Sequence, residues 1–555
     1  MSNEKEYIVT VKEGVDWKEV HHDLTRDTAK DSSVDSNIVP DRTVDVIKLR
    51  RQNKRNTHYN LNDLEAQRLK NDSRIQDVAE VESMQVGFYG KQLGSFTREF
   101  PENNWGLVRH TSTNIFPPHT IYNGGTEYNY VLDGTGVDIV IQDTGIQADH
   151  PEFQDADGNS RVQQIDWSKY DGDWRSDGRA SNYTDNDGHG THVASTAAGK
   201  TYGWAKNAHI FSQKLAEAGG MNNDDAFDSL LGWHNSKAGS RPTVVNMSYG
   251  FLHYLAEVEN GQGTAVIRII QGVPFVDGVV TGGRFRGSTN SITQLSFWRG
   301  RGIGATFLGS SEGIDFYSLD RRLGAFDADV QQCVDAGIVF TKAAGNDNHK
   351  MDVPGGIDFD NKLTSEPLPN GIIRDIEYAR GSSPMTDTGD DIIVGALSSS
   401  GYGLSKDERR SSFSVSGPGV DLYAAGQNIL GALSQTFADK YRNGRRNYGA
   451  DRLDESGGDP AFNETLMQGT SMAAPQVAGM CACILQAHPD WTPKQVKSYL
   501  VNNAVTNQMF TPDIEDNDLR HFTNGNVSSA TLNGGPNRIA YLPMNGASPF
   551  GYSSS

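Results

Sequence analysis

Cysteine is scarce in this chain of 555 residues, which contains only Cys333, Cys481 and Cys483. An odd number without regular spacing excludes a disulfide framework and fits synthesis in a reducing compartment. Cys481 and Cys483 stand two positions apart in a predicted helix, where such side chains point to different faces. We therefore do not expect these two thiols to pair with each other.

Long apolar runs are also missing. The N-terminal stretch "MSNEKEYIVTVKEG" has no apolar segment of the length found in a signal peptide. This predicts synthesis in the cytoplasm and leaves the final location open, since an intracellular and a virion-associated protein are both compatible with it. No run of about 18 apolar residues occurs anywhere, so we expect no transmembrane helix and no membrane partner.

Basic residues are outnumbered, with 50 Lys and Arg against 70 Asp and Glu and a net charge of −20. This balance argues against a phosphate-binding surface and against nucleic acid as a partner. Residues 1–100 hold 16 basic and 18 acidic side chains, a net charge of −2, which leaves −18 for residues 101–555. The first hundred residues are therefore a separate unit by composition. Within them, the basic run "KLRRQNKR" (48–55) predicts a solvated loop, with a nucleic-acid or processing site as the weaker alternative.

Residues 1–86 alternate between strand and helix patterns. Strands are predicted at 6–12, 57–61 and 78–86, and helices at 15–27 and 61–72. Such alternation within about 90 residues predicts a small α+β domain of the ferredoxin-like type. A polar connector at 87–102 follows this domain.

The rest of the chain repeats a different pattern, a short β-branched run that ends in a turn. Examples are "GVDIVIQDTG" (136–145), "AHIFSQKL" (208–215), "TVVNMSYG" (243–250), "GIVFTKAAGN" (337–346) and "DIIVGALS" (391–398). Runs of this kind, separated by helical patterns, predict an α/β domain with a mostly parallel sheet flanked by helices. We place this domain at 103–543, with insertions at 251–324 and 437–466 and a tail at 544–555.

Three residues suited to nucleophilic catalysis lie at the ends of predicted elements. Asp143 ends a strand, His189 in "DGHGTH" begins a helix, and Ser471 in "GTSMAAP" begins another. A serine hydroxyl needs an imidazole to accept its proton, and a carboxylate must hold that imidazole in the right tautomer. A helix that begins at Ser471 would also direct unpaired N–H groups at a developing oxyanion. A zinc site at His189 and His192 is the weaker alternative, because no HExxH motif and no third ligand are present.

Five blocks follow one another in the chain: "DTGIQADHPEF", "HGTHVAS", "NMSYG", "AAGN" and "GTSMAAPQVAG". In sequence and order they resemble the hallmark blocks of the subtilisin-like serine proteases, whose triad also runs Asp, His, Ser. The segments "NNWGLVRHTS" (103–112) and "ERRSSFSVSGPGVDLYAAGQNIL" (408–430) are similar to the proteinase K branch of that family, the first of them to its mature N-terminus. Residues 1–86 resemble the inhibitor-like propeptide of the family.

The resemblance implies a serine endopeptidase that hydrolyses polypeptides through an acyl-enzyme and requires no cofactor for its chemistry. Asp143, His189 and Ser471 would form the triad, and Asn346 would donate a hydrogen bond to the oxyanion. Two segments would pair with an extended substrate through backbone hydrogen bonds, and these are Gly219-Gly220-Met221 and Ser248-Tyr249-Gly250.

The resemblance also implies a structural calcium ion, bound by Asp421 with carbonyl groups near Gly389 and Asp391. A plain structural aspartate is an equal alternative, because calcium sites built mostly from carbonyls leave little trace in a sequence. One position departs from the family: Gln476 stands where a histidine is usual. We expect this change to lie on a helix surface and to be tolerated.

Two hypotheses about the whole chain follow. In the first, the chain is made as a zymogen, its N-terminal domain is a partner of the catalytic domain, and self-cleavage occurs within 87–102. In the second, the chain is a component of a larger assembly, including a viral one, and its protease fold is auxiliary or dormant. The insertion at 251–324 would cap the cleft in the first case or dock an assembly partner in the second.

Overall fold

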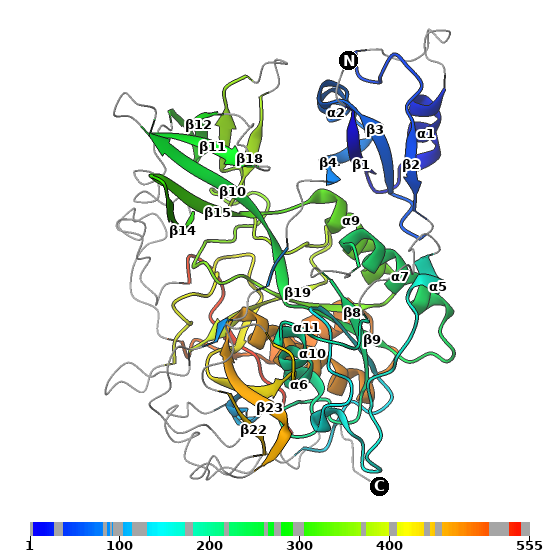
Figure 1. Ribbon diagram of the computed structural model, residues 1–555, viewed down its shortest axis with the longest axis vertical. Coiled ribbons are helices and arrows are strands. Elements are labelled where there is room, and N and C mark those ends of the chain that lie inside the picture. Colours follow the sequence, from blue (N-terminus) through cyan, green and yellow to red (C-terminus); the bar gives the residue numbers. More distant parts are fainter. Residues whose placement is uncertain are drawn as a thin grey trace.

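The structure is a computed structural model of the chain. It describes residues 4–26, 37–50, 52–81, 86–88, 91–92, 104–113, 130–171, 181–215, 221–259, 265–270, 279–291, 305–367, 373–398, 408–437, 445–449, 458–509 and 532–544. Three bodies are visible: a small N-terminal domain, a β-rich lobe beside it and a larger α/β body below both (Figure 1). Among the described residues, no helix combines the length and the apolar character needed to cross a bilayer.

The N-terminal domain is the predicted α+β unit. Its elements are β1 (Lys5–Val11), α1 (Trp17–Thr25), β2 (Val46–Leu49), β3 (Asn56–Leu61), α2 (Asp63–Leu69) and β4 (Ile75–Glu80). The sheet has the order β2-β3-β1-β4, and every neighbouring pair is antiparallel. Val9, Leu24 and Leu61 are among the residues of its own buried core. The strand β2 was not predicted, because its apolar residues fall inside a highly charged stretch.

The central sheet of the α/β body confirms the predicted fold class. Its strands are β7 (Asp138–Asp143), β8 (His209–Lys214), β9 (Thr243–Met247), β16 (Val339–Ala343), β19 (Ile392–Leu397), β20 (Leu422–Ala425), β24 (Val505–Thr506) and β25 (Arg538–Ile539). The order is β24-β25-β20-β19-β16-β9-β7-β8. All neighbours are parallel except the edge pair of β24 and β25.

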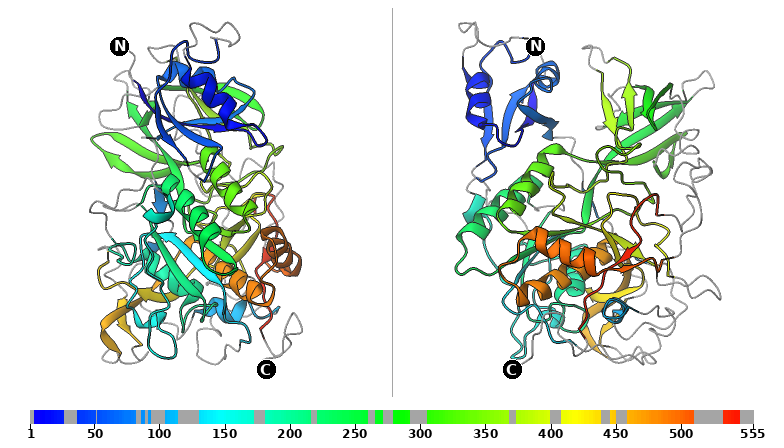
Figure 2. Two further views of the ribbon diagram at one scale, coloured as in Figure 1. Left: turned by 90° about the vertical axis from the view of Figure 1, so that its right-hand side faces the viewer. Right: turned by 180° about the vertical axis from the view of Figure 1, so that it is seen from behind.

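Helices cover both faces of this sheet (Figure 2). The main ones are α6 (His189–Ala198), α7 (Asn223–Ser236), α9 (Gly324–Asp335), α10 (Thr470–Ala487) and α11 (Pro493–Asn503), and shorter turns occur at α3 (Trp105–Arg109), η3 (Pro151–Phe153) and α5 (Ser168–Asp171). Successive residues of one strand belong to different cores: Ile139 packs with residues of α6 and α10, and Val140 with residues of α7 and α9. Burial on both faces explains why these strands are continuous apolar runs.

The first insertion forms the β-rich lobe. Its strands are β10 (Tyr249–Glu259), β11 (Ala265–Ile270), β12 (Val279–Phe285), β13 (Ser288–Ser291), β14 (Thr306–Ser311) and β15 (Ile314–Arg321), joined by β17 (Lys362–Ser365) and β18 (Asp375–Glu377) from further along the chain. Leu255, Ile267 and Leu363 share one buried core. The lobe is therefore not confined to 251–324, because the pairing of β17 with β12 brings later residues into the same sheet.

A smaller sheet and two short connector strands complete the fold. The sheet contains β21 (Ile429–Leu433), β22 (Arg445–Tyr448) and β23 (Asp459–Gln468), so the second insertion is a pair of antiparallel strands. In the connector, β5 (Val86–Phe88) pairs with β10 and β6 (Lys91–Gln92) pairs with β23. The segment after the N-terminal domain thus contributes a strand to each of two sheets.

The basic run at 48–55 is not a solvated loop. Arg50 is only 2% exposed and lies between the acidic helices α7 and α9 of the α/β body. Its guanidinium reaches both carboxylate oxygens of Asp329 at 3.2 and 3.3 Å, and donates to the backbone carbonyl of Asp224 at 2.9 Å. Asp228 lies 3.5 Å from Nε of Arg50 and also accepts from the backbone N–H of Asn53. The prediction was wrong because residues of this basic run pack against the acidic helices of the α/β body and join the N-terminal domain to it.

Two further predictions concern buried side chains. All three cysteines are buried and free. Gln476 is not on a helix surface, because its side chain is completely buried. It accepts from Trp204 Nε1 at 2.7 Å and exchanges hydrogen bonds with Asn104, at the start of α3. The residue therefore fastens the segment at 104–109 to α10.

Candidate active site

Asp143 and His189 form a buried hydrogen-bonded pair. The Nδ1 atom of His189 lies 2.6 Å from Oδ1 of Asp143, and both side chains are fully buried. Asp143 is the last residue of β7, at the carboxyl edge of the parallel sheet, and His189 is the first residue of α6. The hydrogen bond places the ring proton on Nδ1, which leaves the Nε2 lone pair for proton transfer.

Asp185 builds the turn that presents His189. Its carboxylate accepts from the backbone N–H groups of Gly188 and Thr191 at 2.8 and 2.9 Å, and from the hydroxyl of Thr144 at 2.9 Å. Gly188 has φ of +94°, which side chains rarely tolerate, so the sharp entry to α6 needs glycine there. Sequence reasoning missed Asp185, although its position just before "DGHGTH" fits a carboxylate that caps backbone N–H groups at a helix start.

Ser471 lies in the first turn of α10, a helix that packs against α6, β9 and β16. Its hydroxyl donates to the backbone carbonyl of Ser248 at 3.0 Å, and the Ser248 hydroxyl donates back to the Ser471 carbonyl at the same distance. The serine side chain is thus directed at the end of β9 rather than at the imidazole of His189. Its backbone N–H belongs to the helix turn whose N–H groups have no intrahelical partner.

Asn346 is held against the start of the same helix. Its Oδ1 atom accepts from the backbone N–H of Thr470 at 2.8 Å and from the Thr470 hydroxyl at 2.9 Å. Because both partners are donors, this atom must be the amide oxygen, and the Nδ2 group points the other way. Thr470, which precedes the predicted nucleophile Ser471, therefore fixes the orientation of the predicted oxyanion donor.

The two predicted substrate-binding segments differ in what the structure describes. Tyr249 and Gly250 open β10 and pair with Phe88 and Gly87 of the connector, so this edge already holds an antiparallel strand. Met221 forms an isolated parallel bridge with Leu215. Gly219 and Gly220 lie outside the described residues.

His192 is a buried structural residue one turn along α6 from His189. Its Nε2 atom lies 3.0 Å from the Ile429 carbonyl, and burial lowers its pKa to about 3. An imidazole in this state stays neutral across the physiological range and acts as a hydrogen-bond donor to β21.

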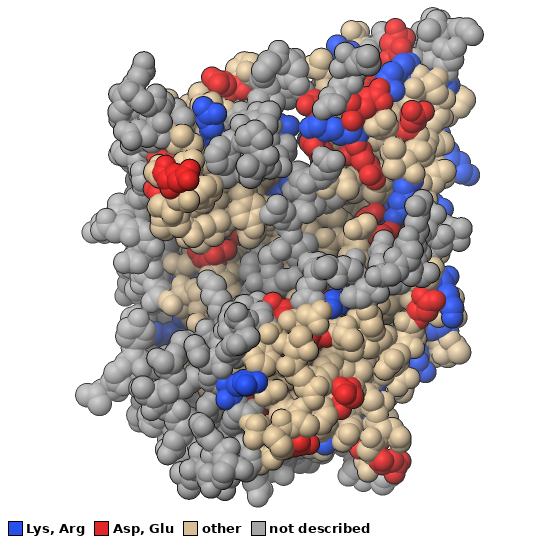
Figure 3. All heavy atoms as spheres, viewed as in Figure 1, with Lys and Arg blue, Asp and Glu red and all other residues tan. Residues whose placement is uncertain are grey.

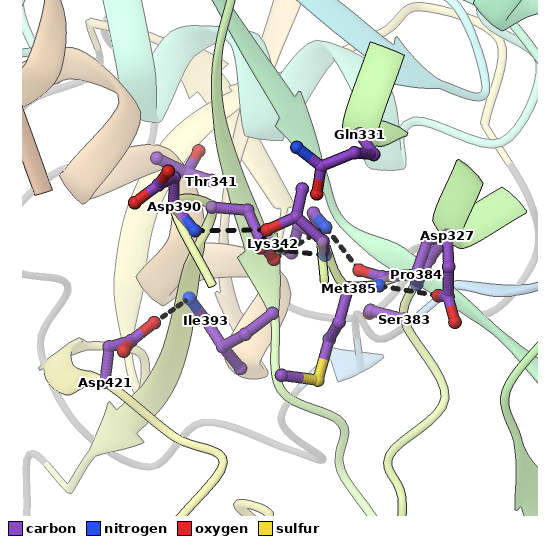
Figure 4. Close-up of polar contacts among 12 residues, drawn as sticks. Asp327, Gln331, Thr341, Lys342, Ser383, Pro384, Met385, Asp390, Ile393 and Asp421 are labelled. Carbon is purple, nitrogen blue, oxygen red and sulfur yellow. Dashed lines mark hydrogen bonds and ion pairs between the residues drawn. The ribbon is translucent and has the colours of Figure 1, made fainter. Parts of the chain in front are cut away.

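Two of the predicted calcium ligands, Asp421 and Asp391, are bound to the ammonium group of a lysine. The ammonium group of Lys497, on α11, lies 2.7 Å from Oδ1 of Asp421 and 2.7 Å from the backbone carbonyl of Asp391. The other carboxylate oxygen of Asp421 accepts from the Ile393 N–H at 2.9 Å (Figure 4). Gly389 has φ of +67° in the turn before Asp391.

The side chain of Asp391 is engaged as well. It forms a buried ion pair with Lys342 at 2.8 Å and accepts from the backbone N–H of Thr386 at 3.0 Å. Burial would raise its pKa, but the charges of Lys342 and Lys497 lower it to about 2. These residues therefore do not fit a bound Ca²⁺, because the Asp421 carboxylate and the Asp391 carbonyl that would coordinate the ion are paired with Lys497.

Comparisons with known proteins show the family to which the chain belongs. The model of the subtilase family matches residues 134–526, which is more than half of the chain. The cuticle-degrading serine protease of Arthrobotrys oligospora is 33% identical over 152 residues, or 27% of this chain and 34% of that protein. The chain matches about a third of the length of this relative and of its counterpart from Orbilia oligospora.

Two longer matches extend the comparison. The extracellular serine proteinase of a Thermus species (strain Rt41A) is 26% identical over 462 residues, 83% of this chain and 72% of that protein. The crystal structure of a cold-adapted subtilisin-like serine proteinase overlaps 79% of this chain and 97% of its own, with a TM-score of 0.42 and 22% identity. With the family model covering most of the α/β body, including Asp143, His189 and Ser471, the chain belongs to the subtilase family of serine proteases.

Proposed function

We propose that the chain is a serine endopeptidase in which Ser471 is the nucleophile, His189 the general base and Asp143 the carboxylate that orients the imidazole. The observation that carries this proposal is the buried 2.6 Å hydrogen bond from His189 Nδ1 to Asp143, at the sheet edge where α10 begins. This pair sets the tautomer that a general base needs.

The reaction follows from these positions. The Ser471 hydroxyl turns from the Ser248 carbonyl toward His189 Nε2, a rotation about one side-chain bond. Its oxygen bonds to the substrate carbonyl carbon while the proton passes to Nε2, and the same proton then goes to the leaving amine as the C–N bond breaks. Water attacks the acyl-enzyme in the same way and releases the acid. The Asn346 amide and the backbone N–H of Ser471 donate to the oxyanion in both halves.

Hydrolysis of casein and reaction with serine-directed sulfonyl or phosphonyl reagents test this proposal. Ser471→Ala should lower turnover by about 10⁶-fold, as found for the subtilisin nucleophile. Asn346→Ala should lower kcat by about 10²–10³-fold with little change in KM, because its hydrogen bond forms mainly in the transition state. Ser236→Ala is the matched control, since the hydrogen bonds of that hydroxyl go to two carbonyls of its own helix α7. Full activity in Ser471→Ala would refute the assignment.

We also propose that the chain is a zymogen whose N-terminal domain is removed by self-cleavage. The support is the register of the connector on either side of the nucleophile. The connector has two paired segments. In the first, Gly87 and Phe88 pair with Gly250 and Tyr249. In the second, Lys91 and Gln92 pair with Gln468 and Met467, which lie three and four positions before Ser471 in the sequence. A chain paired on both sides of a protease centre is held as an extended substrate is held.

The two ladders point to one bond. Only two residues, Tyr89 and Gly90, separate the paired segments in the sequence, and both lie outside the described residues. The first ladder ends where Phe88 pairs with Tyr249, next to Ser248, whose carbonyl accepts from Ser471. The second begins where Lys91 pairs with Gln468. Because the paired segments flank these two residues in the sequence, we propose that cleavage occurs at the Tyr89–Gly90 bond within the predicted connector.

Mass spectrometry of the purified chain tests this assignment. Wild type should yield fragments 1–89 and 90–555, and Ser471→Ala should stay intact. The fraction cleaved should not depend on protein concentration, since the bond lies in the same molecule as the nucleophile. An active wild type that is still intact from its first residue would refute the zymogen, whereas a new N-terminus elsewhere would refute only the register. The assembly hypothesis with a dormant protease fold stays a prediction, and no contact described here favours it.

A further inference from the structure

A cluster outside the triad joins the β-rich lobe to the loop of the oxyanion donor. Asp320 belongs to β15, and Asp347 and His349 follow Asn346 by one and three positions. One ligand atom from each of Asp320, Asp347 and His349 lies within 4.8 Å of the others. Asp320 and His349 are only 2% and 7% exposed, and Asp347 is half-buried. Two carboxylates and an imidazole therefore face one another where little water can separate them.

The carboxylate of Asp320 is not satisfied by the protein. Both of its oxygens are buried, and neither has a hydrogen-bond partner among the described residues. A buried polar group without a partner costs about 1–3 kcal/mol, and more if it is charged. The contact described for this carboxylate is with Nδ1 of His349, 3.3 Å from Oδ2. A buried carboxylate that faces an imidazole nitrogen without a hydrogen bond indicates that a further group belongs between these atoms.

The other ring nitrogen of His349 suggests what that group is. Its Nε2 atom lies 3.3 Å from the Thr306 hydroxyl, on β14. If Nε2 carries the proton and donates a hydrogen bond to the Thr306 hydroxyl, the Nδ1 lone pair faces the carboxylate of Asp320. A metal-bound histidine typically donates its second N–H to an oxygen in this way. Neutral imidazole and two carboxylates also balance the charge of one divalent cation.

We propose that Asp320, Asp347 and His349 form a binding site for a divalent transition-metal ion, with Zn²⁺ the best match. Imidazole nitrogen and carboxylate oxygen are both common ligands of Zn²⁺, whereas Ca²⁺ takes oxygen ligands almost alone. Three protein ligands leave a coordination position for water, which suits the half-buried side of Asp347.

The loop that supplies two of the ligands is already held in place. The backbone N–H of Asn348 donates to the Phe413 carbonyl at 2.8 Å, and that of Ser416 donates to the His349 carbonyl at 3.1 Å. Because Asp320 comes from the lobe, a bound ion would tie β15 to the segment that begins at Asn346. The metal would thus position the oxyanion loop relative to the lobe, and would take no part in the bond-making steps.

Metal content of the full-length Ser471→Ala chain tests the proposal without any activity assay. The protein is stripped with chelator, titrated with Zn²⁺ by calorimetry and assayed for retained zinc after gel filtration. We expect one Zn²⁺ site. Loss of a hydrogen-bond partner of a metal ligand typically lowers metal affinity by about 10- to 100-fold. Asp320→Asn removes a ligand itself and should lower the Zn²⁺ affinity by more than that. Asp315→Asn, a carboxylate of the same strand that accepts from Ser310, is the matched control and should bind like wild type.

A second variant guards against misfolding. Asp347→Asn alters a half-buried residue and should also weaken binding, while its circular dichroism and unfolding midpoint without metal match the parent. Equal Zn²⁺ affinity in the parent, Asp320→Asn and Asp347→Asn would overturn the proposal. So would a parent that binds no Zn²⁺, since His349 would then be a structural partner of Asp320 and not a metal ligand.

Discussion

Arg50 should determine how tightly the N-terminal domain holds the catalytic domain. Its guanidinium is fully buried between α7 and α9, with Asp329 at 3.2 Å and Asp228 at 3.5 Å. Removing one partner of a buried ion pair typically costs about 3–5 kcal/mol, because the remaining charge has lost its solvent as well as its partner. At 1.4 kcal/mol per tenfold, Arg50→Met should raise the dissociation constant of the domain by about 100- to 3,000-fold. Methionine keeps much of the side-chain stem, so the loss reports on the charge.

The size of this effect should depend on pH. Burial raises the pKa of Asp329 to about 7 even though Arg50 lowers it. Without the guanidinium, this carboxylate takes up a proton more readily while the domain is docked, and a neutral acid costs less to bury. The penalty of Arg50→Met should therefore be larger at pH 8 than at pH 6.

Dilution of the self-cleaved, non-covalent complex measures this constant. Activity on a peptide substrate rises as the domain dissociates, so its dependence on protein concentration gives Kd. Arg68→Met is the control, because Arg68 is an exposed arginine on α2 of the same domain. Equal Kd values for the two variants would show that the buried ion pair contributes nothing net to docking. Basic and acidic side chains are mixed over the visible face of this domain (Figure 3), so the charge of that surface does not distinguish Arg50, which is buried.

Local patterns predicted the elements of the catalytic body well, and the reason is physical. A strand buried on both faces must be apolar along its whole length, so β7, β9, β16 and β19 could be found from composition alone. The glycine turns before His189 and Ser471 likewise marked the starts of α6 and α10. These features depend on residues that are near one another in the sequence, so they can be recognised without knowledge of the fold.

Features that depend on distant partners were missed. Arg50 was expected in solvent because nothing near it shows that Asp329 will lie beside it. Gln476 was placed on a helix surface because its partners, Asn104 and Trp204, come from segments far away in the chain. The extension of the lobe beyond its predicted end has the same cause, since β17 is defined by its pairing with β12.

Two buried features give the remaining predictions. Burial lowers the pKa of His110 and of His192 to about 3, against about 6.5 in an unfolded chain. The unfolded state thus binds more protons between these values, so both residues contribute stability that is complete above about pH 6.5 and is lost as pH falls toward 3. Urea unfolding of Ser471→Ala should show it, and His192→Gln should lower the slope of stability against pH by about 1.4 kcal/mol per unit; an unchanged slope would contradict the reasoning. The second feature is the ammonium group of Lys497, which occupies the place predicted for calcium between Asp421 and the Asp391 carbonyl. A cation that is part of the chain needs no added ion, so the unfolding midpoint of the metal-stripped protein should be the same without and with excess Ca²⁺. Lys497→Met leaves the oxygens without a cation, and its lowered midpoint should be partly restored by Ca²⁺, because an ion that binds only the folded state stabilises it by mass action. A midpoint of the metal-stripped protein that rises with Ca²⁺, and no longer does so in Asp421→Asn, would instead show that calcium binds there and that the lysine is displaced from its oxygens.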